Sequence, residues 1–225
     1  MVFEDLGTIG YGAAWDIQQQ LVERRKARQI PDTLLLLEHN HVFTLGRNAR
    51  AEHLLSRPPE VEVHQTNRGG DITYHGPGQL VGYPIFDLAG IRKYVVWYVR
   101  SLEETLIRTL ADFGIAAGRN PGFTGVWVEG EKIAAIGVHI SRWVTCHGFA
   151  LNVAPELRYF QCIVPCGIRQ CSVTSMERLL SRRPDMQAVK QAVAGHFERV
   201  FTTQGQTAVQ GSRFNVQRPT LNLER

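Results

Sequence analysis

The segment from Arg68 to Pro84 contains five glycines and two prolines among seventeen residues. Charged, aromatic and hydroxyl side chains stand between them, a combination that neither a solvent-exposed loop nor a buried strand normally has. Because glycine has no side chain, a glycine-rich backbone can approach a ligand closely and reach positive φ angles. The segment therefore predicts the wall of a binding site. A tight hairpin with incidental charges is an equally good interpretation of this segment alone.

The rest of the chain is typical of a globular domain, with 225 residues of which 44% are apolar and 20% charged. Periodicity predicts helices over 11–29, 95–113, from 175, and over 185–203. Strands are predicted over 33–38, 42–45, 61–66, 80–88, 126–128, 132–140 and 143–153. Without regular βαβ alternation, this order predicts an α+β domain whose mixed, largely antiparallel sheet packs with helices. We expect a single catalytic domain over residues 1–204 and a tail over 205–225 that is partly ordered at best.

Charge, hydropathy and cysteine content narrow the function classes. The net charge of +4 comes without a Lys/Arg run or zinc finger spacing, so we expect no nucleic acid partner and favour an acidic protein partner. No apolar run is long enough for a bilayer, and the N-terminus lacks a signal-peptide pattern, which predicts a cytoplasmic protein that does not contact membranes. Four cysteines are too few for a disulfide framework in a chain of this size.

Cys166 lies in the sequence Val-Pro-Cys-Gly-Ile. The proline fixes the approach of the chain, and backbone N–H groups after the cysteine can face an oxyanion that develops beside the sulfur. A thiol becomes nucleophilic near neutral pH when a base or a positive charge lies beside it. Lys132 begins the apolar run Lys-Ile-Ala-Ala-Ile-Gly, and an amine in apolar surroundings can act as such a base. We therefore predict Cys166 and Lys132 as candidate catalytic residues.

Both residues also have simpler interpretations. A single cysteine is more often a small buried apolar residue than a nucleophile, and Lys132 after Gly130-Glu131 could be a solvated turn residue. Metal binding is a further alternative, although the spacing lacks the paired cysteines of structural zinc sites. Its ligands would be Cys162, Cys166, Cys171 and His147. In an extended strand His147 and Asn152 point to opposite faces, so they need not form one site.

Together, these motifs resemble those of the lipoyl(octanoyl) transferase family. The resemblance lies in Arg68 to Tyr83, in Lys132-Ile-Ala-Ala-Ile-Gly-Val, in His147-Gly-Phe-Ala-Leu-Asn-Val, and in Pro165-Cys-Gly-Ile followed by Val173-Thr-Ser. The four segments stand in the family's order and cover most of residues 30–180. The first segment is highly specific by itself.

The resemblance implies the fold of biotin and lipoate protein ligase catalytic domains and a dyad of Cys166 and Lys132. In the implied reaction, the Cys166 thiolate takes the octanoyl group from octanoyl-acyl carrier protein. A lysine of a lipoyl domain, on a 2-oxoacid dehydrogenase subunit or the glycine cleavage carrier protein, then takes the group from Cys166. Lys132 would accept the proton of the thiol and later that of the incoming ammonium. The octanoyl group is bound as a thioester first to the carrier protein and then to Cys166. It therefore stays activated until the amide forms, and no ATP, metal or other cofactor is expected. This reaction is the first step of endogenous lipoate biosynthesis.

The resemblance also implies an acyl pocket with small residues that suit a straight octanoyl chain, whose buried methylenes contribute about 0.8 kcal/mol each. The expected pocket residues are Arg68, Gly69, Gly70, Asp71, Ile72, Thr73, Tyr74, His75, Ala135, Ile136, Gly137, Gly148, Phe149 and Ala150. Of the other histidines, His139 and His147 are weaker candidates because they lie in less specific motifs. The family pattern gives no role to Cys146, Cys162 or Cys171. We expect packing for Cys162 and Cys171, and the alternative is an inactivating disulfide of one of them with Cys166.

Two other functions stay open at this point. An ATP-dependent lipoate or biotin ligase on the same fold would activate a free acid and would not need Cys166. A non-catalytic module that binds metal or a carrier protein would form no acyl adduct.

Overall fold

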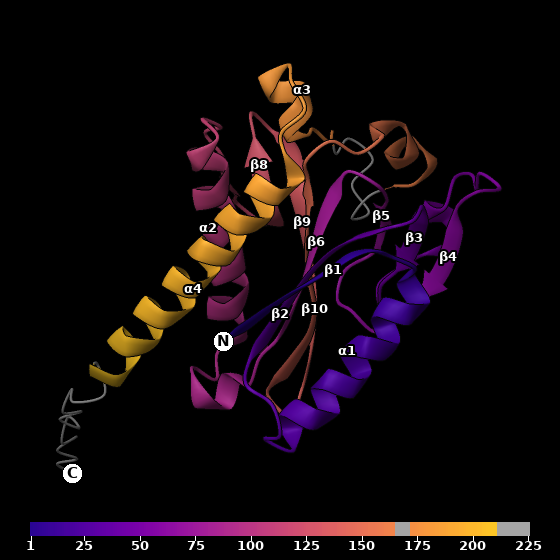
Figure 1. Ribbon diagram of the computed structural model, residues 1–225. Coiled ribbons are helices and arrows are strands. Elements are labelled where there is room, and N and C mark those ends of the chain that lie inside the picture. The colour runs from indigo at the N-terminus through magenta and orange to yellow at the C-terminus, as the bar shows by residue number, and fades with distance from the viewer. Residues whose placement is uncertain (165–171, 211–225) are drawn as a thin grey trace, which may run out of the picture.

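A seven-stranded sheet forms the centre of the molecule in the computed structural model, which describes residues 1–164 and 172–210, with side chains as far as Thr202 (Figure 1). The strand order is β1-β2-β6-β10-β9-β8-β7. The bounds are β1 Val2–Ile9, β2 Thr33–His39, β6 Gln79–Ile85, β7 Gly118–Asn120, β8 Phe123–Val128, β9 Glu131–Ser141 and β10 Val144–Asn152. β1 and β2 are parallel, whereas the neighbouring pairs from β2 to β7 are antiparallel. The predicted α+β fold with a largely antiparallel mixed sheet is confirmed.

A second, three-stranded sheet has the order β4-β3-β5, with β3 at Val42–Leu45, β4 at Glu62–Gln65 and β5 at Ile72–His75. The glycine-rich segment includes β5 of this small sheet and continues into β6 of the large one. The hairpin interpretation is therefore wrong, because β5 pairs with β3 while β6 pairs with β2 and β10. Gly69 N–H donates to the Val138 carbonyl oxygen of β9 at 2.9 Å, which ties the segment to the large sheet.

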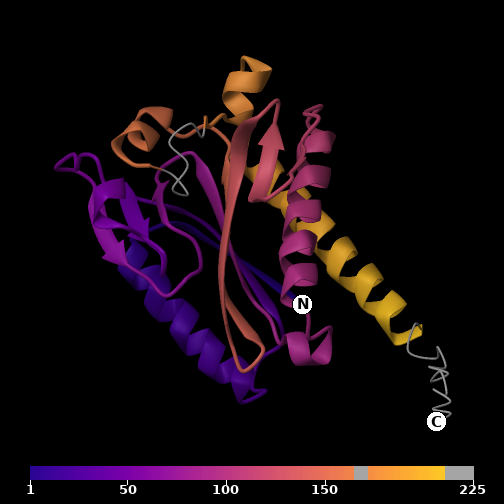
Figure 2. The same ribbon diagram turned by 180° about the vertical axis from the view of Figure 1, so that it is seen from behind.

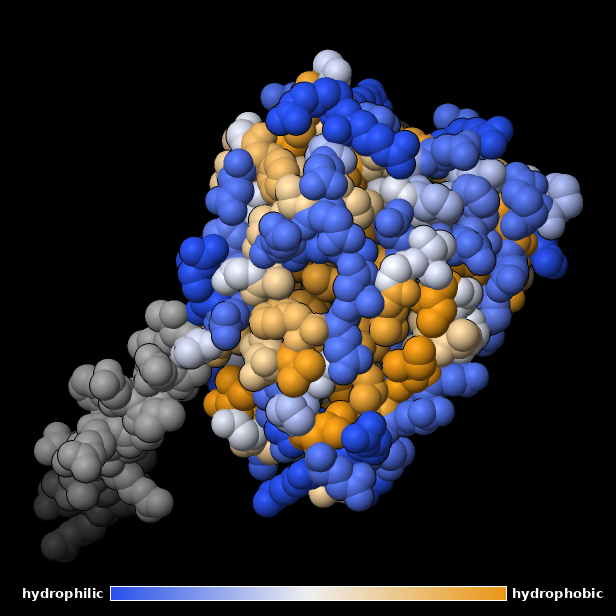
Figure 3. Space-filling model, in the orientation of Figure 1, coloured by the Kyte–Doolittle hydropathy of each residue, from blue (hydrophilic) through white to orange (hydrophobic). Residues whose placement is uncertain are grey.

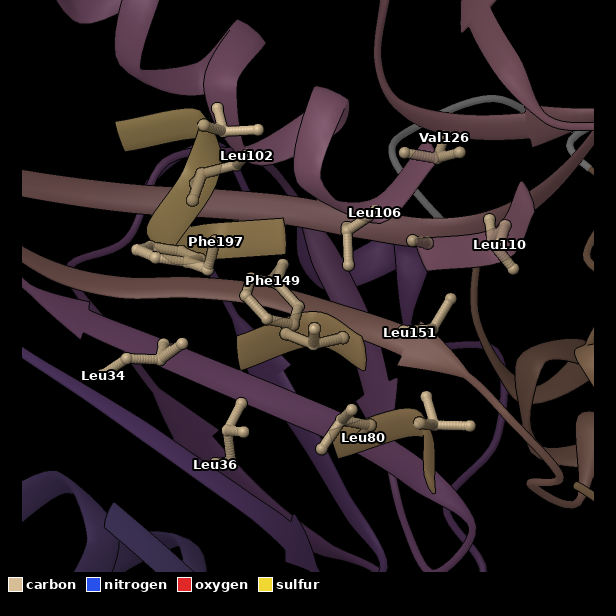
Figure 4. Packing of buried hydrophobic residues seen from close by; sticks show 14 of the residues in the cluster. Leu34, Leu36, Leu80, Leu102, Leu106, Leu110, Val126, Phe149, Leu151 and Phe197 are labelled. Atoms are coloured by element: carbon tan, nitrogen blue, oxygen red, sulfur yellow. The ribbon is translucent and has the colours of Figure 1, made fainter. Parts of the chain in front are cut away.

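Helices cover both faces of the large sheet (Figures 1 and 2). α1, at Tyr11–Lys26, lies on the same face as the small sheet, and α2 and α4 pack side by side on the other. Leu102, Leu106 and Leu110 recur every fourth residue of α2, so they share one face, and all are fully buried (Figure 4). The remaining bounds are α2 Val95–Asp112, α3 Met176–Leu180, α4 Met186–Gln210, and the short 3₁₀ helices η1 Ala51–His53, η2 Leu88–Gly90 and η3 Leu157–Cys162. No helix in this part of the chain is long and apolar enough to cross a membrane.

Three strands were not expected from the sequence: β1, β5 and β7. β1 is an edge strand that is exposed along most of its length, so it lacks the alternation of buried and exposed residues by which strands are recognised. Val2 and Phe3 contribute to its exposed apolar surface, and Figure 3 shows hydrophobic patches on a mostly hydrophilic face. α4 continues to Gln210, past the expected domain boundary at residue 204. The division into a domain and a tail stays a prediction.

Candidate active site

A pocket lies between the glycine-rich segment and strands β9 and β10. Every residue expected in the acyl pocket lines it except Tyr74. The lining is Arg68, Gly69, Gly70, Asp71, Ile72, Thr73, His75, Lys132, Ala135, Ile136, Gly137, Gly148, Phe149 and Ala150, together with Tyr11, Tyr83 and His147. The structure thus brings three of the four sequence motifs to one cavity.

Tyr74 and Phe149 belong to the cores on either side of this pocket. Tyr74 is fully buried in a cluster with Phe43, and its hydroxyl hydrogen-bonds Nδ1 of His41 at 2.8 Å. It points away from Thr73 and His75 because successive residues of a strand face opposite sides. The Phe149 ring packs in the main core with Leu80 and Leu151, as Figure 4 shows. Phe149 is therefore a core residue at the edge of the pocket.

Lys132 is the second residue of β9 and is only 5% exposed. Its Nζ lies 4.7 Å from the centre of the Trp127 ring, where the face of the indole attracts a cation. The solvated-turn interpretation of Lys132 is therefore wrong. Gly125 of β8 has φ +129, and a Cβ there would lie 3.4 Å from Lys132 Cε and 2.6 Å from the Ala134 carbonyl oxygen. Buried Glu103 of α2 accepts the Gly125 N–H at 3.1 Å, which fixes the strand beside the lysine.

Cys166 and Cys171 lie outside the described residues, but the chain on both sides of them is anchored at the site. Val164 N–H donates to the His53 carbonyl oxygen at 2.8 Å. On the other side, Lys132 N–H donates to Ser172 O at 2.8 Å, and Thr174 N–H donates to Lys132 O at 3.0 Å.

Three buried histidines on the α1 side of the large sheet are neutral near pH 7. Burial lowers the pKa of His75 and of His147 to about 3, and that of His39, behind the pocket, to about 4. His75 Nδ1 donates to Gln79 Oε1 at 2.7 Å, and His39 Nδ1 donates to Ile9 O at 2.9 Å. The pocket wall therefore has polar groups that already hold partners, which suits an uncharged ligand.

Gln79 continues a hydrogen-bond chain from the pocket toward Lys132. Gln79 Nε2 donates to Asn152 Oδ1 at 2.9 Å, and Asn152 Nδ2 donates to Thr174 O at 3.0 Å. His147 instead bonds Asn67 Oδ1 through Nε2 at 2.8 Å. His147 and Asn152 thus hydrogen-bond to different partners and belong to separate networks.

Arg68 brings a buried positive charge to the pocket wall, since it is 7% exposed. Its Nη2 donates to the carbonyl oxygen of Thr44 at 2.5 Å and to the hydroxyl of Thr44 at 2.9 Å, and Nη1 donates to Gly69 O at 3.1 Å. These bonds orient the guanidinium and bind the small sheet to the glycine-rich segment.

Two tyrosines of the pocket were missed from the sequence. Tyr83 belongs to the glycine-rich segment, and its hydroxyl donates to His39 Nε2 at 2.8 Å, so membership of the motif could have identified it. Tyr11 begins α1, and its ring lies nearly parallel to that of His75 with centroids 6.5 Å apart. No local pattern marks Tyr11, because its place in the pocket depends on how α1 packs over the sheet.

The described cysteines are packing residues. Cys146 is 2% exposed on β10, and burial raises the pKa of its thiol to about 11, which makes it a poor nucleophile. Cys162 packs against the core of the small sheet. Within residues 1–164 and 172–202, no group of three histidine, cysteine or acidic side chains could hold a metal ion.

The fold is that of lipoate and biotin protein ligase catalytic domains. A crystal structure of lipoate-protein ligase A bound with ATP has a TM-score of 0.69 at 12% identity and covers 94% of this chain and 95% of that one. Biotin protein ligase from Aquifex aeolicus has a TM-score of 0.54 at 11% identity over 92% of this chain and 71% of that one. Residues 10–198 match the family model described as the lipoyl protein ligase A/B catalytic domain. The chain belongs to this family.

Curated relatives are much more similar in sequence. The octanoyltransferase of Solibacter usitatus (strain Ellin6076) is 55% identical over 201 residues, which cover 87% of this chain and 90% of the relative. The octanoyltransferase of Gloeobacter violaceus (strain ATCC 29082 / PCC 7421) is 52% identical over 88% of this chain and 89% of the relative. The family resemblance seen in the sequence motifs is thereby confirmed.

Proposed function

We propose that this protein is an octanoyltransferase that moves an octanoyl group from an acyl carrier protein to the lysine amine of a lipoyl domain. The identity of 55% to an octanoyltransferase over 87% of the chain carries this conclusion. The pocket agrees with it, because most of its lining is apolar, glycine or neutral polar, the Arg68 guanidinium in its wall is held by Thr44 and Gly69, and Lys132 belongs to the lining. The lipoyl domains of 2-oxoacid dehydrogenases, the glycine cleavage carrier protein and a cytoplasmic site of action are part of the proposal.

Cys166 is the proposed nucleophile and Lys132 its base. The thiol proton passes to Lys132, the thiolate attacks the octanoyl thioester, and the departing carrier thiolate takes the proton back from Lys132. The anchoring of Val164 to His53 and of Ser172 to Lys132 supports this assignment, since Cys166 stands between Val164 and Ser172 in the sequence. The acyl group stays activated as a thioester, so the first half-step needs no ATP.

The first test is intact-protein mass spectrometry after mixing the chain with octanoyl-acyl carrier protein, wild type beside Cys166→Ala. We expect one octanoyl group on the wild type, labile to hydroxylamine, and none on the variant. Cys162→Ala is the matched control and should still be acylated, because Cys162 packs against the core of the small sheet. An adduct of equal amount on Cys166→Ala would contradict the assignment.

A ligase that activates free octanoate with ATP is the second candidate, because the lipoate-protein ligase with the same fold was crystallised with ATP. The two functions are distinguished by giving the chain a lipoyl domain with free octanoate and ATP in place of the acylated carrier. Octanoylation of a lipoyl domain that requires ATP and survives Cys166→Ser would favour the ligase.

Gly137 offers a test of the acyl pocket. A Cβ at this residue would lie 3.0 Å from Gly69 O and 3.2 Å from Arg68 Cδ, so a branched side chain must occupy pocket volume. We expect Gly137→Val to prefer hexanoyl over octanoyl donors in a competition of the two acyl carriers. Gly118→Val is the control, because no atom lies within 4 Å of a Cβ there. An unchanged octanoyl preference in folded Gly137→Val would place the acyl chain elsewhere.

A further inference from the structure

His53 and Asp71 form a pair that the reaction described above does not use. Nδ1 of His53 lies 2.5 Å from Oδ2 of Asp71, and the side chains are 15% and 9% exposed. The Asp71 carboxylate is itself fixed in orientation, because its Oδ1 accepts the Ile72 N–H at 2.7 Å. A carboxylate at Nδ1 keeps the imidazole proton on that atom, which leaves Nε2 with the lone pair of a base.

The pair lies beside the pocket, close to the point where the described chain ends at Val164. A cleft beside the pocket is lined by His53, Asp71 and Lys132 together, and Asp71 and Lys132 also line the pocket itself. The His53 carbonyl oxygen accepts the N–H of Val164, two residues before Cys166. The other charged side chain of this cleft in the described part of the chain is Arg50, which pairs with Glu52 at 3.8 Å.

This inference rests on the proposed acyl transfer. In its second half-step the nitrogen of the acceptor lysine gives up two protons, which calls for two proton acceptors. The acceptor lysine arrives as an ammonium, its nitrogen forms the amide bond to the octanoyl carbon, and the carbon–sulfur bond to Cys166 breaks. The nitrogen loses two protons on the way from ammonium to amide. The sulfur regains one of them as it becomes a thiol, so the other must leave the site.

Lys132 cannot carry both protons at once, since a single amine accepts one. It is also buried against Trp127, whereas the His53 side chain keeps contact with solvent at 15% exposure. We propose that His53, oriented by Asp71, takes the first proton from the incoming lysine ammonium and releases it to solvent. Lys132 carries the second proton to the sulfur of Cys166.

The decisive experiment separates the two half-steps in a His53→Gln variant. We expect octanoyl-enzyme to form at the wild-type rate, whereas octanoyl transfer to a lipoyl domain slows by about 10²-fold or more. Hydroxylamine then replaces the lipoyl domain as acceptor. It is mostly unprotonated at neutral pH and needs no base before it attacks, so its reaction with the octanoyl-enzyme should keep the wild-type rate. Asp71→Asn, which alters the orienting group, should slow transfer to the lipoyl domain by a smaller factor than His53→Gln.

A second histidine–aspartate pair supplies the matched control. His196 Nε2 lies 2.7 Å from Asp112 Oδ2, between α4 and α2 on the opposite face of the sheet. His196→Gln should leave both half-steps unchanged. Equal slowing of His53→Gln with both acceptors, or unimpaired transfer to the lipoyl domain, would overturn the role of His53. A wild-type chain that forms no octanoyl-enzyme would instead overturn the proposed function, and this role with it.

Discussion

Lys132→Met is expected to form octanoyl-enzyme about 10²- to 10⁴-fold more slowly than the wild type, the range that a positioned general base contributes. The side chain is 5% exposed and lies against the Trp127 ring, so water has little access to replace the lost amine. Methionine has a similar length and no polar group, so it should fit between Trp127 and Gly125. The measurement is the single-turnover rate of octanoyl-enzyme formation, followed by mass spectrometry.

The Lys132→Arg variant tests whether the Lys132 side chain acts as a base or only as a positive charge. Arginine keeps the charge that could pair with a thiolate, but it does not release its proton in the accessible pH range. We therefore expect Lys132→Arg to be nearly as slow as Lys132→Met. Lys190→Met is the matched control, because Lys190 is 6% exposed and pairs with Asp5 at 2.7 Å between α4 and β1. Near wild-type rates in Lys132→Arg would show that the charge matters and the base does not.

The lining of this pocket was largely predictable, because the glycine-rich segment has an unusual composition and the other lining residues lie in motifs by which the chain resembles a known family. The glycine-rich segment, the run from Lys132 and the segment from His147 all meet at one cavity. What the motifs did not give is the direction of each side chain. Tyr74 stands between pocket residues and points to the opposite side of its strand, which the alternation of a strand could have indicated. Phe149 lines the edge of the pocket, and its ring packs in the main core.

Other parts of the site depend on tertiary packing and had no local signal. Tyr11 reaches the pocket because α1 crosses the large sheet, and His53 meets Asp71 across eighteen residues of chain. Trp127 and Gly125 surround Lys132 from the neighbouring strand, so their role depends on strand pairing. Helix α2, by contrast, was predicted within one residue at its C-terminal end, because its apolar residues recur on one face and pack on the sheet.

The free energy of unfolding is expected to fall steeply as the pH drops from 6.5 toward 4. Burial lowers the pKa of His39 to about 4 and that of His75 and of His147 to about 3, against an ordinary value of 6.5. In this window the unfolded chain binds a proton at each of these histidines while the folded chain does not, so protonation favours unfolding. Each buried histidine lowers the free energy of unfolding by up to about 1.4 kcal/mol per pH unit, and by about 1 kcal/mol between pH 6.5 and 5.5, where its proton uptake in the unfolded chain is still incomplete. The three together lower it by about 3 kcal/mol over that interval. Such a loss is a large part of the usual stability of a domain.

Urea denaturation at pH 7 and at pH 5.5 measures this difference directly. His147→Gln should reduce the pH dependence by about one third, because one of the three contributing protons is removed. His64→Gln is the control, since His64 lies on β4 with its side chain 35% exposed and outside the pocket lining. Asp and Glu residues titrate mainly below this window, so the histidines dominate it. Equal stability at both pH values would mean that these imidazoles accept protons in the folded protein, and the pocket wall would then be charged at pH 5.5.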